Sequence, residues 1–583
     1  MKYFLLLTAA AAVAFVTLLP AQPAPATDPI FQAMKDELAR AKSMTLSNLE
    51  GPYFVEYVLD EEEAFTVSAN LGALLSREHQ RFRSPEIHVR VGDYKFDNTN
   101  FGGGGFGGSR YDLERFPLED SYPLLRRYFW LLTDGSYKSA VEAISRKRAA
   151  LRNLQQGEQL PDFDHAEPVK SVRPLLRLAV DEEGLAGRVR SLSAIFADYP
   201  AVKTSGVELE SSQGGFHLAN TEGSEVREPE SVTFLRARAT AQAADGMSLR
   251  DSVTFYAHDA AHLPPDAELR RGITAMAENV VALAKAPKGE DYNGPILFEG
   301  VAGPQILAEV LGRNLTMTRQ PAGGGGRGGQ TQPGEFEGRI GARVLPESFD
   351  VVDDPTQTEW RGRALFGSYQ VDREAVPAKP LRLVDKGTLK SYLLTRQPVR
   401  GYEQSNGRAR LPGSFGASMA TISNLFISTN EFMPMGELKK KMLDLIKNRN
   451  KPYGIIVRKM DFPSSASLAE ARSIASGQQG GRPVSMPILV YKIYADGHEE
   501  LVRGMRFRGL TGKSLKDIIA AGDDQNVLEY MENGAPFAIL GGGRFTTEAC
   551  VVAPSILVDD LELHPVEEEM PKLPIVSAPE MSK

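Results

Sequence analysis

The sequence predicts an α+β protein, with a mixed α/β N-terminal domain followed by a strand-rich, largely antiparallel C-terminal domain. Long amphipathic helices and strands alternate before residue 290, whereas short strands separated by turns dominate after it. The pattern changes near 287–294, where Pro287 and an Asn-Gly-Pro turn interrupt the chain. We therefore expect an N-terminal domain at 27–290 and a C-terminal domain at 291–565.

The expected N-terminal domain contains four helices, because apolar residues recur at helical spacing in four segments. These are 30–47, 121–156, 182–197 and 266–285. Alternating apolar and polar residues predict the strands. The strands are expected at 51–71, 86–98, 203–220, 231–240 and 250–257. The first of these segments is interpreted as two strands joined by an acidic turn from Asp60 to Glu63, and the glycine-rich stretch 102–108 as a surface loop.

The expected C-terminal domain opens with an apolar strand at 296–298 that runs into a helix ending at Gly312. Residues 321–334 are rich in glycine and predict a disordered loop, and 566–583 predict an acidic tail. Hairpin turns are expected at 385–387 and 495–498. Further helices are expected at 434–448 and 513–521, and strands at 338–352, 365–372, 380–385, 388–394, 453–459, 486–495, 499–508, 548–553 and 556–563.

The first 26 residues are typical of a cleaved secretory signal. Lys2 is followed by an apolar stretch at 4–19, and Ala24-Pro25-Ala26 offers a small-x-small cleavage site. Thr27 is then the expected first residue of the mature chain, although an uncleaved N-terminal anchor is the alternative. No later stretch is apolar for the ~18 residues of a transmembrane helix. We therefore expect an exported protein, periplasmic or extracellular, with no transmembrane segment after cleavage.

Composition limits the classes of function. The net charge of −8 argues against nucleic acid as the main partner, because phosphate binding needs a basic surface. Cys550 is the only cysteine, which excludes an internal disulfide and zinc sites rich in cysteine. The hydrophobic share of 42% is ordinary for a globular protein with a core large enough to fold without disulfides.

Three short motifs suggest chemistry that their context does not favour. Gly-Leu-Thr-Gly-Lys-Ser at 509–514 resembles a nucleotide-binding loop, but Phe507 stands where the first glycine is needed, so a strand-to-helix turn is expected. His258 and His262 have the spacing of a zinc pair, yet they lie in a connection, where a surface loop is favoured. His498-Glu499-Glu500 follows a hairpin turn, and these side chains are expected to be solvated.

An ordered set of segments resembles the TldD/PmbA family of metallopeptidase-related proteins. No single segment is decisive, but together they cover most of 50–565 in the family's order. They are VRVGDY (89–94), FDNTN (96–100), ENVVAL (278–283), YNGP (292–295), FEGVAG (298–303), DDPT (353–356), VPA (376–378), DKG (385–387), SNGRAR (405–410) and VAPSIL (552–557).

The resemblance implies an N-terminal α/β domain, a strand-rich C-terminal domain and assembly as dimers. The catalytic branch of the family resembles a zinc peptidase with His-Glu-x-x-x-His on a helix and a cysteine as third ligand. In this chain that window aligns with 298–303, so Phe298 and Gly303 stand where the histidines should be and only Glu299 remains. Cys550 does not match the ligand cysteine securely. Glu299 has a second interpretation, as a carboxylate near a helix N-terminus.

These observations leave three hypotheses. In the first, the chain is a PmbA/TldE-like, non-catalytic subunit of a peptide-processing complex, without zinc of its own, and it forms a dimer with a TldD-like zinc peptidase homologue. In the second, it is an active metallopeptidase whose relocated zinc site uses His258, His262 and Glu299. In the third, it is a standalone extracellular protein that binds peptides in a cleft between its domains.

Overall fold

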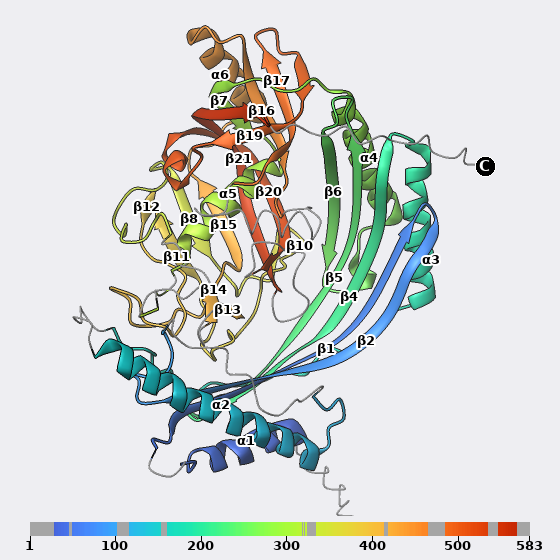
Figure 1. The fold of residues 1–583 in the computed structure, drawn as a ribbon. Helices are drawn as coiled ribbons and strands as arrows, with labels where there is room; N and C mark the ends of the chain where they lie inside the picture. The colour runs from blue at the N-terminus through green and yellow to red at the C-terminus, as the bar shows by residue number, and fades with distance from the viewer. Residues whose placement is uncertain are drawn as a thin grey trace, which may run out of the picture.

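The computed structural model describes residues 28–45, 49–101, 116–152, 160–317, 319, 321–322, 334–412, 418–463, 484–533 and 546–567. The predicted secretory signal, the glycine-rich loop at 102–108, most of 321–334 and most of the acidic tail lie outside these residues. The described chain forms two large sheets with helices packed against them (Figure 1). This arrangement confirms the predicted α+β class and the antiparallel, strand-rich C-terminal region.

The N-terminal sheet has six strands in the order β2-β1-β4-β5-β3, with β6 also paired to β5. All pairs are antiparallel except β3 with β5. Its strands are β1 (Pro52–Asn70), β2 (Ala73–Val91), β3 (Lys170–Val172), β4 (Val202–Asn220), β5 (Glu225–Gln242) and β6 (Ser248–Ala257). The long strands curve strongly, and the C-terminal domain lies on their concave side (Figure 1).

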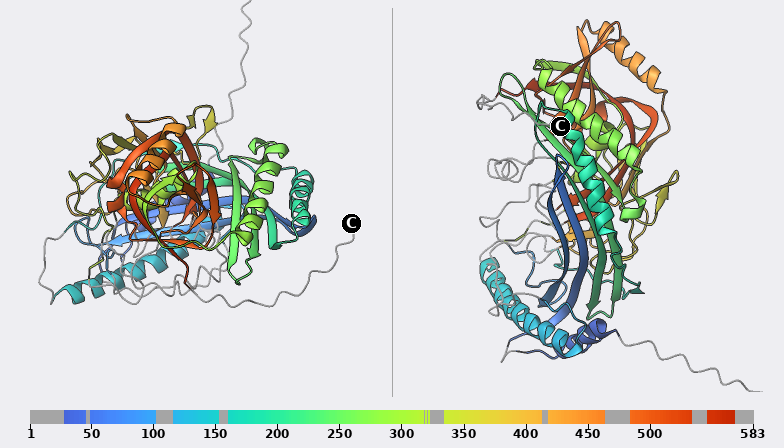
Figure 2. Two further views of the ribbon diagram at one scale, coloured as in Figure 1. Left: turned by 90° about the horizontal axis from the view of Figure 1, so that it is seen from above. Right: turned by 90° about the vertical axis from the view of Figure 1, so that its right-hand side faces the viewer.

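Helices cover this sheet at two places. α3 (Glu182–Ser193) and α4 (Asp266–Lys285) lie against its convex side, where they bury a shared apolar cluster. α1 (Pro29–Ala41) and α2 (Tyr122–Leu151) pack together at the lower end of the strands. The side view in Figure 2 shows the long strands running from this pair of helices toward the C-terminal domain. The four predicted helices are thus present, although the first ends at Ala41 rather than at residue 47.

The predicted acidic turn from Asp60 to Glu63 is wrong, because these residues continue β1 without a break. β1 is paired on both sides, with β2 and β4, so its backbone is fully satisfied there. The acidic side chains also find cations: Glu61 accepts hydrogen bonds from Arg81 and Arg83. The chain reverses later, at Leu71 and Gly72, where φ is +47° and +82°. A run of carboxylates therefore indicates a turn only if the fold supplies no partners for it.

The C-terminal sheet has eleven strands in the order β12-β11-β8-β15-β21-β7-β16-β17-β18, with β19 and β20 also paired to β21. Only β15 with β21 and β16 with β7 are parallel. The strands are β7 (Tyr292–Phe298), β8 (Phe349–Asp353), β11 (Leu381–Asp385), β12 (Thr388–Leu389), β15 (Asn424–Thr429), β16 (Tyr453–Met460), β17 (Pro487–Tyr494), β18 (Glu499–Val502), β19 (Met505–Arg508), β20 (Ile518–Asn533) and β21 (Thr546–Pro565). Two small two-stranded sheets lie beside it, β9 (Glu359–Trp360) with β10 (Arg363–Ala364) and β13 (Ala409–Pro412) with β14 (Ser418–Ala420).

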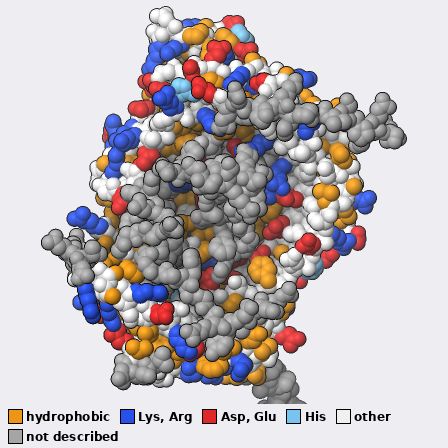
Figure 3. All heavy atoms as spheres, in the orientation of Figure 1, with side chains coloured by type: hydrophobic (Ala, Val, Ile, Leu, Met, Phe, Trp, Pro, Cys, Tyr) orange, Lys and Arg blue, Asp and Glu red, His pale blue; other side chains and the backbone are white. Residues whose placement is uncertain are grey.

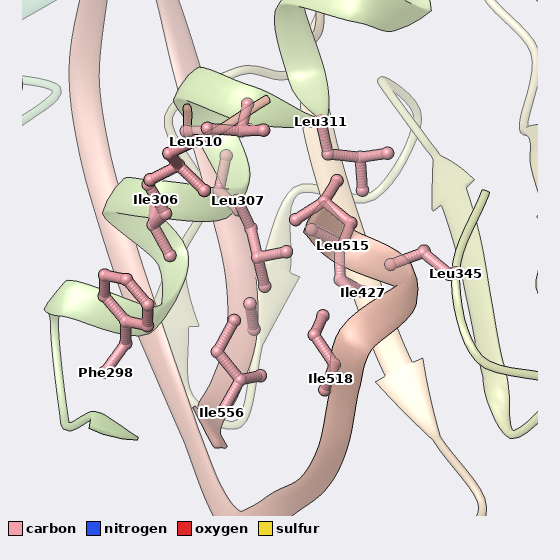
Figure 4. Packing of buried hydrophobic residues seen from close by; sticks show 14 of the residues in the cluster. Phe298, Ile306, Leu307, Leu311, Leu345, Ile427, Leu510, Leu515, Ile518 and Ile556 are labelled. Atoms are coloured by element: carbon pink, nitrogen blue, oxygen red, sulfur yellow. The ribbon is translucent and has the colours of Figure 1, made fainter. Parts of the chain in front are cut away.

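The core of this domain surrounds α5 (Ala302–Val310), every residue of which is buried. Figure 4 shows Ile306 and Leu307 of this helix in one buried cluster with Ile518 and Ile556 of the strands, and Leu311, just after the helix, beside Leu515. α6 (Met435–Asn448) lies on the other side of β7 and buries one apolar stripe. The helix predicted to end at Gly312 therefore forms the centre of the domain.

Several predicted C-terminal elements are wrong. Residues 365–372 form no strand, since the backbone N–H of Gly367 donates to the Asn424 side chain and that of Gln370 to Glu228. Of 338–352, only the part from Phe349 is a strand. The helix predicted at 513–521 is a short 3-10 turn, Gly512–Asp517, followed by the unpredicted strand β20. The two strands predicted around Pro554 are one strand, β21.

The two predicted hairpins are confirmed. Asp385-Lys386-Gly387 forms the hairpin turn between β11 and β12, with φ of +45° at Lys386 and +70° at Gly387. The hairpin at 495–498 joins β17 and β18. The chain passes from the first sheet to the second between Lys285 and Tyr292. None of the helices in the described ranges has the length and apolar character needed to cross a membrane.

Candidate functional site in the cleft between the two sheets

Phe298 and Gly303 occupy positions that packing determines. Phe298 ends β7, is fully buried, and stacks on Phe507 with ring centroids 5.7 Å apart. Gly303 lies in the first turn of α5, where a Cβ would come within 2.4 Å of the Pro554 carbonyl oxygen. Neither residue has a side-chain donor for a metal ion. Helix α5 thus lies closer to β21 than a histidine at position 303 would allow.

Glu299 is held by cations rather than by the helix N-terminus. Its carboxylate accepts a hydrogen bond of 2.5 Å from Arg458 Nε and lies 2.8 Å from Lys439 Nζ. Although burial raises it, the hydrogen bonds from Lys439 and Arg458 hold the pKa of Glu299 below its usual value. Both oxygens of Glu299 are engaged, which leaves none to act as a general base or to bind a metal ion.

The residues present do not fit the zinc ion of the catalytic branch. A catalytic zinc site needs about three protein ligands and an open position for water. Cys550 is fully buried, and burial raises the pKa of its thiol to about 12, so the thiolate that binds zinc is strongly disfavoured. Within the described ranges, no group of three or more His, Cys, Asp or Glu residues is placed to hold a metal ion.

The structure does not bring His258 and His262 together with Glu299. His262 is exposed and pairs with Asp259 at 2.7 Å, in the surface connection expected from the sequence. His258 lies instead against Phe366, with ring centroids 5.9 Å apart. The hypothesis of a relocated zinc site therefore has no support in the geometry of these residues.

The other two motifs also take structural roles. In 509–514 the Thr511 hydroxyl caps the short turn that starts at Gly512, as the prediction of a strand-to-helix turn required. His498 stacks on Tyr494 at the hairpin, with ring centroids 4.2 Å apart. Glu499 is not solvated as expected, because it pairs with Arg458 at 2.8 Å.

A cavity of about 630 Å³ lies between the concave side of the N-terminal sheet and the C-terminal domain. β1, β4, β5 and β6 form one wall, and residues of α5, β16, β17, β20 and β21 form the other. A second cavity of about 500 Å³ shares Glu230, Ser231, Arg373 and Glu548 with the first, so the two form one cleft. Figure 3 shows acidic and basic side chains side by side on the described surface of this region.

Ion pairs across the cleft connect the two sheets. Arg373 of the C-terminal domain lies 2.7 Å from Asp60 and 3.2 Å from Glu230. Arg250 pairs with Asp461 at 2.7 Å. Lys459 of β16 also reaches the N-terminal sheet, at 2.5 Å from Asp251. Partly buried pairs of this kind hold the two walls at a defined separation.

Carboxylates of the N-terminal sheet line the cleft at alternate positions of three strands. They are Asp60 and Glu62 of β1, Glu210 of β4, and Glu228 and Glu230 of β5. The side chain of Glu210 forms no hydrogen bond or ion pair with any described residue, and burial with repulsion from Glu62 and Glu208 raises its pKa to about 7. The sequence analysis missed this set, because it assigned the β1 residues to a turn. The available signals were the acidic run at 60–63 and the alternating pairs Glu208/Glu210 and Glu228/Glu230.

Parts of the sequence are similar to known metallopeptidase-related proteins. Residues 295–467 match the family model described as the PmbA/TldA metallopeptidase C-terminal domain. A metalloprotease of Archaeoglobus fulgidus is 32% identical over 97 residues, which is 17% of this chain and 21% of that protein. A metalloprotease of Methanocaldococcus jannaschii is 32% identical over 98 residues, 17% of this chain and 20% of that protein. These matches span about a fifth of the length of each of the two relatives.

Solved structures share the fold over nearly the whole chain. A protein described as a modulator of DNA gyrase from Thermotoga maritima has a TM-score of 0.55 at 15% identity, covering 91% of this chain and 100% of that one. TldE from Thermococcus kodakarensis has a TM-score of 0.52 at 11% identity, covering 91% and 99%. At such identities the similarity shows a common fold and nothing of activity.

Proposed function

Because this chain belongs to the TldD/PmbA family of metallopeptidase-related proteins, we propose that it is a non-catalytic member that binds peptides and acts with a zinc-bearing homologue. The homologue supplies the His-Glu-x-x-x-His motif and the hydrolytic chemistry. This chain supplies the cleft between its two sheets, and the two form a heterodimer or larger complex.

The window at 298–303 is the observation that carries this proposal. A peptidase zinc site needs imidazole ligands on a helix and a free carboxylate beside them. Here the first position is the buried Phe298, and Glu299 is paired with Arg458 and Lys439. The last position is Gly303, where a Cβ atom would lie 2.4 Å from a neighbouring carbonyl oxygen. β7, α5 and β21 pack closely around Phe298 and Gly303, neither of which can bind a metal ion.

The cleft supports the binding half of the proposal. Its main cavity, about 630 Å³, lies within the range of ~300–1,000 Å³ that is usual for ligand sites. It sits where two packed units meet, a common position for such sites. Its walls combine apolar side chains with charged ones, which suits a peptide of mixed character.

We propose further that the complex works outside the cytoplasm. The first 26 residues support this, since they have the charged start, apolar stretch and small-x-small site of a secretory signal. A catalytic partner must then carry an export signal of its own. N-terminal sequencing of the protein from the envelope fraction of its host tests the proposal: Thr27 as first residue supports it, and an intact Met1 in the cytoplasmic fraction contradicts it.

Reconstitution tests the division of labour. The full chain, a zinc-bearing family member from the same host, and their mixture are each incubated with a mixed peptide library, and cleavage is followed by mass spectrometry. We expect cleavage by the mixture and none by this chain alone. The control is the partner with its first motif histidine replaced, which should abolish cleavage by the mixture. Cleavage by this chain alone, sensitive to a chelator, would overturn the proposal.

A standalone peptide-binding protein is the second candidate function, because the cleft is built wholly from this chain. A pull-down from the native envelope fraction separates it from the first. Recovery of a zinc-bearing homologue supports the complex, whereas recovery of this chain alone, with peptide binding intact, supports the standalone protein.

A further inference from the structure

We infer that the cleft selects peptides carrying lysine or arginine, and that Glu62 and Glu210 receive the cationic side chain. This inference rests on the proposed peptide-binding function and adds a substrate class to it. Glu62 lies on β1 and Glu210 on the neighbouring strand β4, and both line the main cavity.

The two carboxylates converge on one stretch of the sheet. Glu62 accepts a hydrogen bond of 2.5 Å from the Ser212 hydroxyl, and Ser212 is two residues from Glu210 on the same strand. Residues two apart on a strand point to the same side of the sheet. The carboxylate of Glu62 therefore lies on the same side of the sheet as Glu210. The charge of Glu62 also contributes, after burial, to the raised pKa of Glu210.

The protein itself shows how this surface binds a guanidinium. Arg373 reaches across the cleft to Asp60 and Glu230, and its guanidinium lies over the ring of Phe216, 4.8 Å from the centroid. Asp60 and Phe216 are directly opposite each other in the pairing of β1 with β4. The carboxylate and the aromatic ring thus hold one cation between them.

A second carboxylate lies opposite an aromatic ring on the next pair of strands, β4 and β5, and no cation of the described C-terminal domain pairs with it. Glu210 is directly opposite Phe234 in the pairing of β4 with β5, and both residues line the main cavity. The guanidinium of Arg236 lies 5.4 Å from the Phe234 centroid, but Arg236 is paired with Glu208. A cationic side chain from a peptide would complete this second site as Arg373 completes the first.

Other charged residues that line the main cavity form ion pairs within the protein. Glu61 pairs with Arg81 and Arg83, Glu529 with Arg363, and Asp461 with Arg250. The lining cations Arg458 and Lys459 pair with Glu299 and Asp251, which lie outside the cavity lining. Glu62 and Glu210 thus remain as carboxylates without an ion pair among the described residues, so the cavity has a local excess of negative charge.

A buried carboxylate in the second cavity, Glu228, has one oxygen without a partner among the described residues. Glu228 is 2% exposed, and its Oε2 has no hydrogen-bond partner in the described part of the chain. Its Oε1 accepts from Arg173 and from the backbone of Gln370. A buried oxygen without a partner is costly unless a ligand or water satisfies it. This oxygen is a second sign that the cleft is completed by a donor from outside the protein.

Apolar residues beside the acidic pair suit the stem of a long cationic side chain. Val232, Phe234 and Tyr256 lie on the N-terminal wall, with Leu528 and Met531 opposite. Lysine and arginine bury their methylene groups against such surfaces while the charged end reaches a carboxylate. A free inorganic cation would leave these walls unused, which is why we assign the site to a peptide side chain.

Fluorescence anisotropy with matched peptides tests the inference on the full chain. Labelled nonapeptides of alanine and serine differ only at the central residue: Lys, Arg, norleucine or Glu. We expect the Lys and Arg peptides to bind at least ~10-fold more tightly than the norleucine peptide, equivalent to ~1.4 kcal/mol, with the Glu peptide weakest. The preference should shrink as salt is raised.

Variants locate the site. Glu62→Gln with Glu210→Gln should remove the preference for Lys and Arg while binding of the norleucine peptide is kept. The control, Glu78→Gln, changes an exposed carboxylate of the same sheet and should leave the preference intact. Thermal unfolding confirms that each variant is folded before it is titrated.

The outcomes separate this inference from the proposal beneath it. Equal binding of all four peptides, or a preference that survives the double substitution, overturns the inference but leaves peptide binding standing. If no peptide binds, the proposed function fails as well. If spermidine competes fully with the Lys peptide while the norleucine peptide never binds, the ligand is a small polyamine, and the assignment to a peptide is overturned.

Discussion

Replacing Glu210 by glutamine should stabilise the protein above about pH 4.5, and most strongly at neutral and alkaline pH. Glu210 faces Glu62 from β1, Glu208 from its own strand and Arg236 from β5. Burial, together with repulsion from the two carboxylates, raises its pKa from 4.5 to about 7. In the unfolded chain the side chain ionises near its ordinary value, so folding at pH 6 requires it to take up a proton.

The sign and size of the effect follow from that shift. Below pH 4.5 the carboxyl is neutral in both states and glutamine changes little; the penalty grows as pH rises and is complete above about pH 7. At about 1.4 kcal/mol for each tenfold change in proton affinity, a pKa raised from 4.5 to about 7 costs about 3 kcal/mol. Because Glu210 is only half-buried, solvent screening reduces the expected gain to about 1–2 kcal/mol.

Urea unfolding of Glu210→Gln and the parent protein at pH 5.0, 6.5 and 8.0 measures this gain. We expect the stability difference between them to increase with pH, and Glu78→Gln to show no such trend. A gain that is equal at all three pH values would refute the reasoning, because it would not come from ionisation. A loss of stability at pH 8.0 would show that the Glu210 carboxylate has a cationic partner in the folded protein.

Three further predictions concern the packing of the window and the cleft. Gly303→Ala should lower the free energy of unfolding by about 1–3 kcal/mol, because its Cβ would meet a carbonyl oxygen at 2.4 Å. The control Gly187→Ala, at an exposed helix position with open space around it, should raise the free energy of unfolding by about 0.5–1 kcal/mol. Equal effects of the two substitutions in denaturant unfolding would contradict the close approach at Gly303. Arg373→Gln should cost about 2–4 kcal/mol, since it leaves two carboxylates without their shared cation, whereas exposed Arg382→Gln should change the same measurement little. Cys550 should react with a thiol reagent at pH 8 only after unfolding, because it is fully buried and its pKa is raised to about 12; rapid labelling of the folded protein would show that it is accessible.

Local pattern was enough to predict most of the helices and the fold class. It failed where contacts with residues distant in the sequence determine the structure. α4 (Asp266–Lys285) matches the helix predicted at 266–285 residue for residue, because its apolar stripe is complete within its own sequence. β20 was missed because Gly522, Asp523 and Asp524 are typical of a turn. The strand accommodates them in an irregularity of its pairing with β21, where the Asp524 side chain accepts hydrogen bonds from Ser555. That partner is 31 residues away, beyond the reach of periodicity.

The candidate site was less predictable than the fold. Alignment to the family's motif identified the positions of Phe298, Glu299 and Gly303, but not the cations that hold Glu299 or the β21 carbonyl that faces Gly303. The acidic wall of the cleft depends on the register of three strands, β1, β4 and β5, so no strand alone shows that its carboxylates face the same cavity as those of its neighbours. Which of these carboxylates are paired also depends on Arg373, which belongs to the other domain and lies more than a hundred residues later in the chain.

The zinc content of the purified chain tests the central claim most directly. The protein is loaded with excess zinc, desalted into metal-free buffer and analysed by mass spectrometry for metal, beside a family member that retains the His-Glu-x-x-x-His motif as the control. Because the window offers no imidazole and Glu299 is engaged by Arg458 and Lys439, we predict less than ~0.1 zinc per chain here and about one in the control. About one zinc per chain, retained after desalting, would contradict the account.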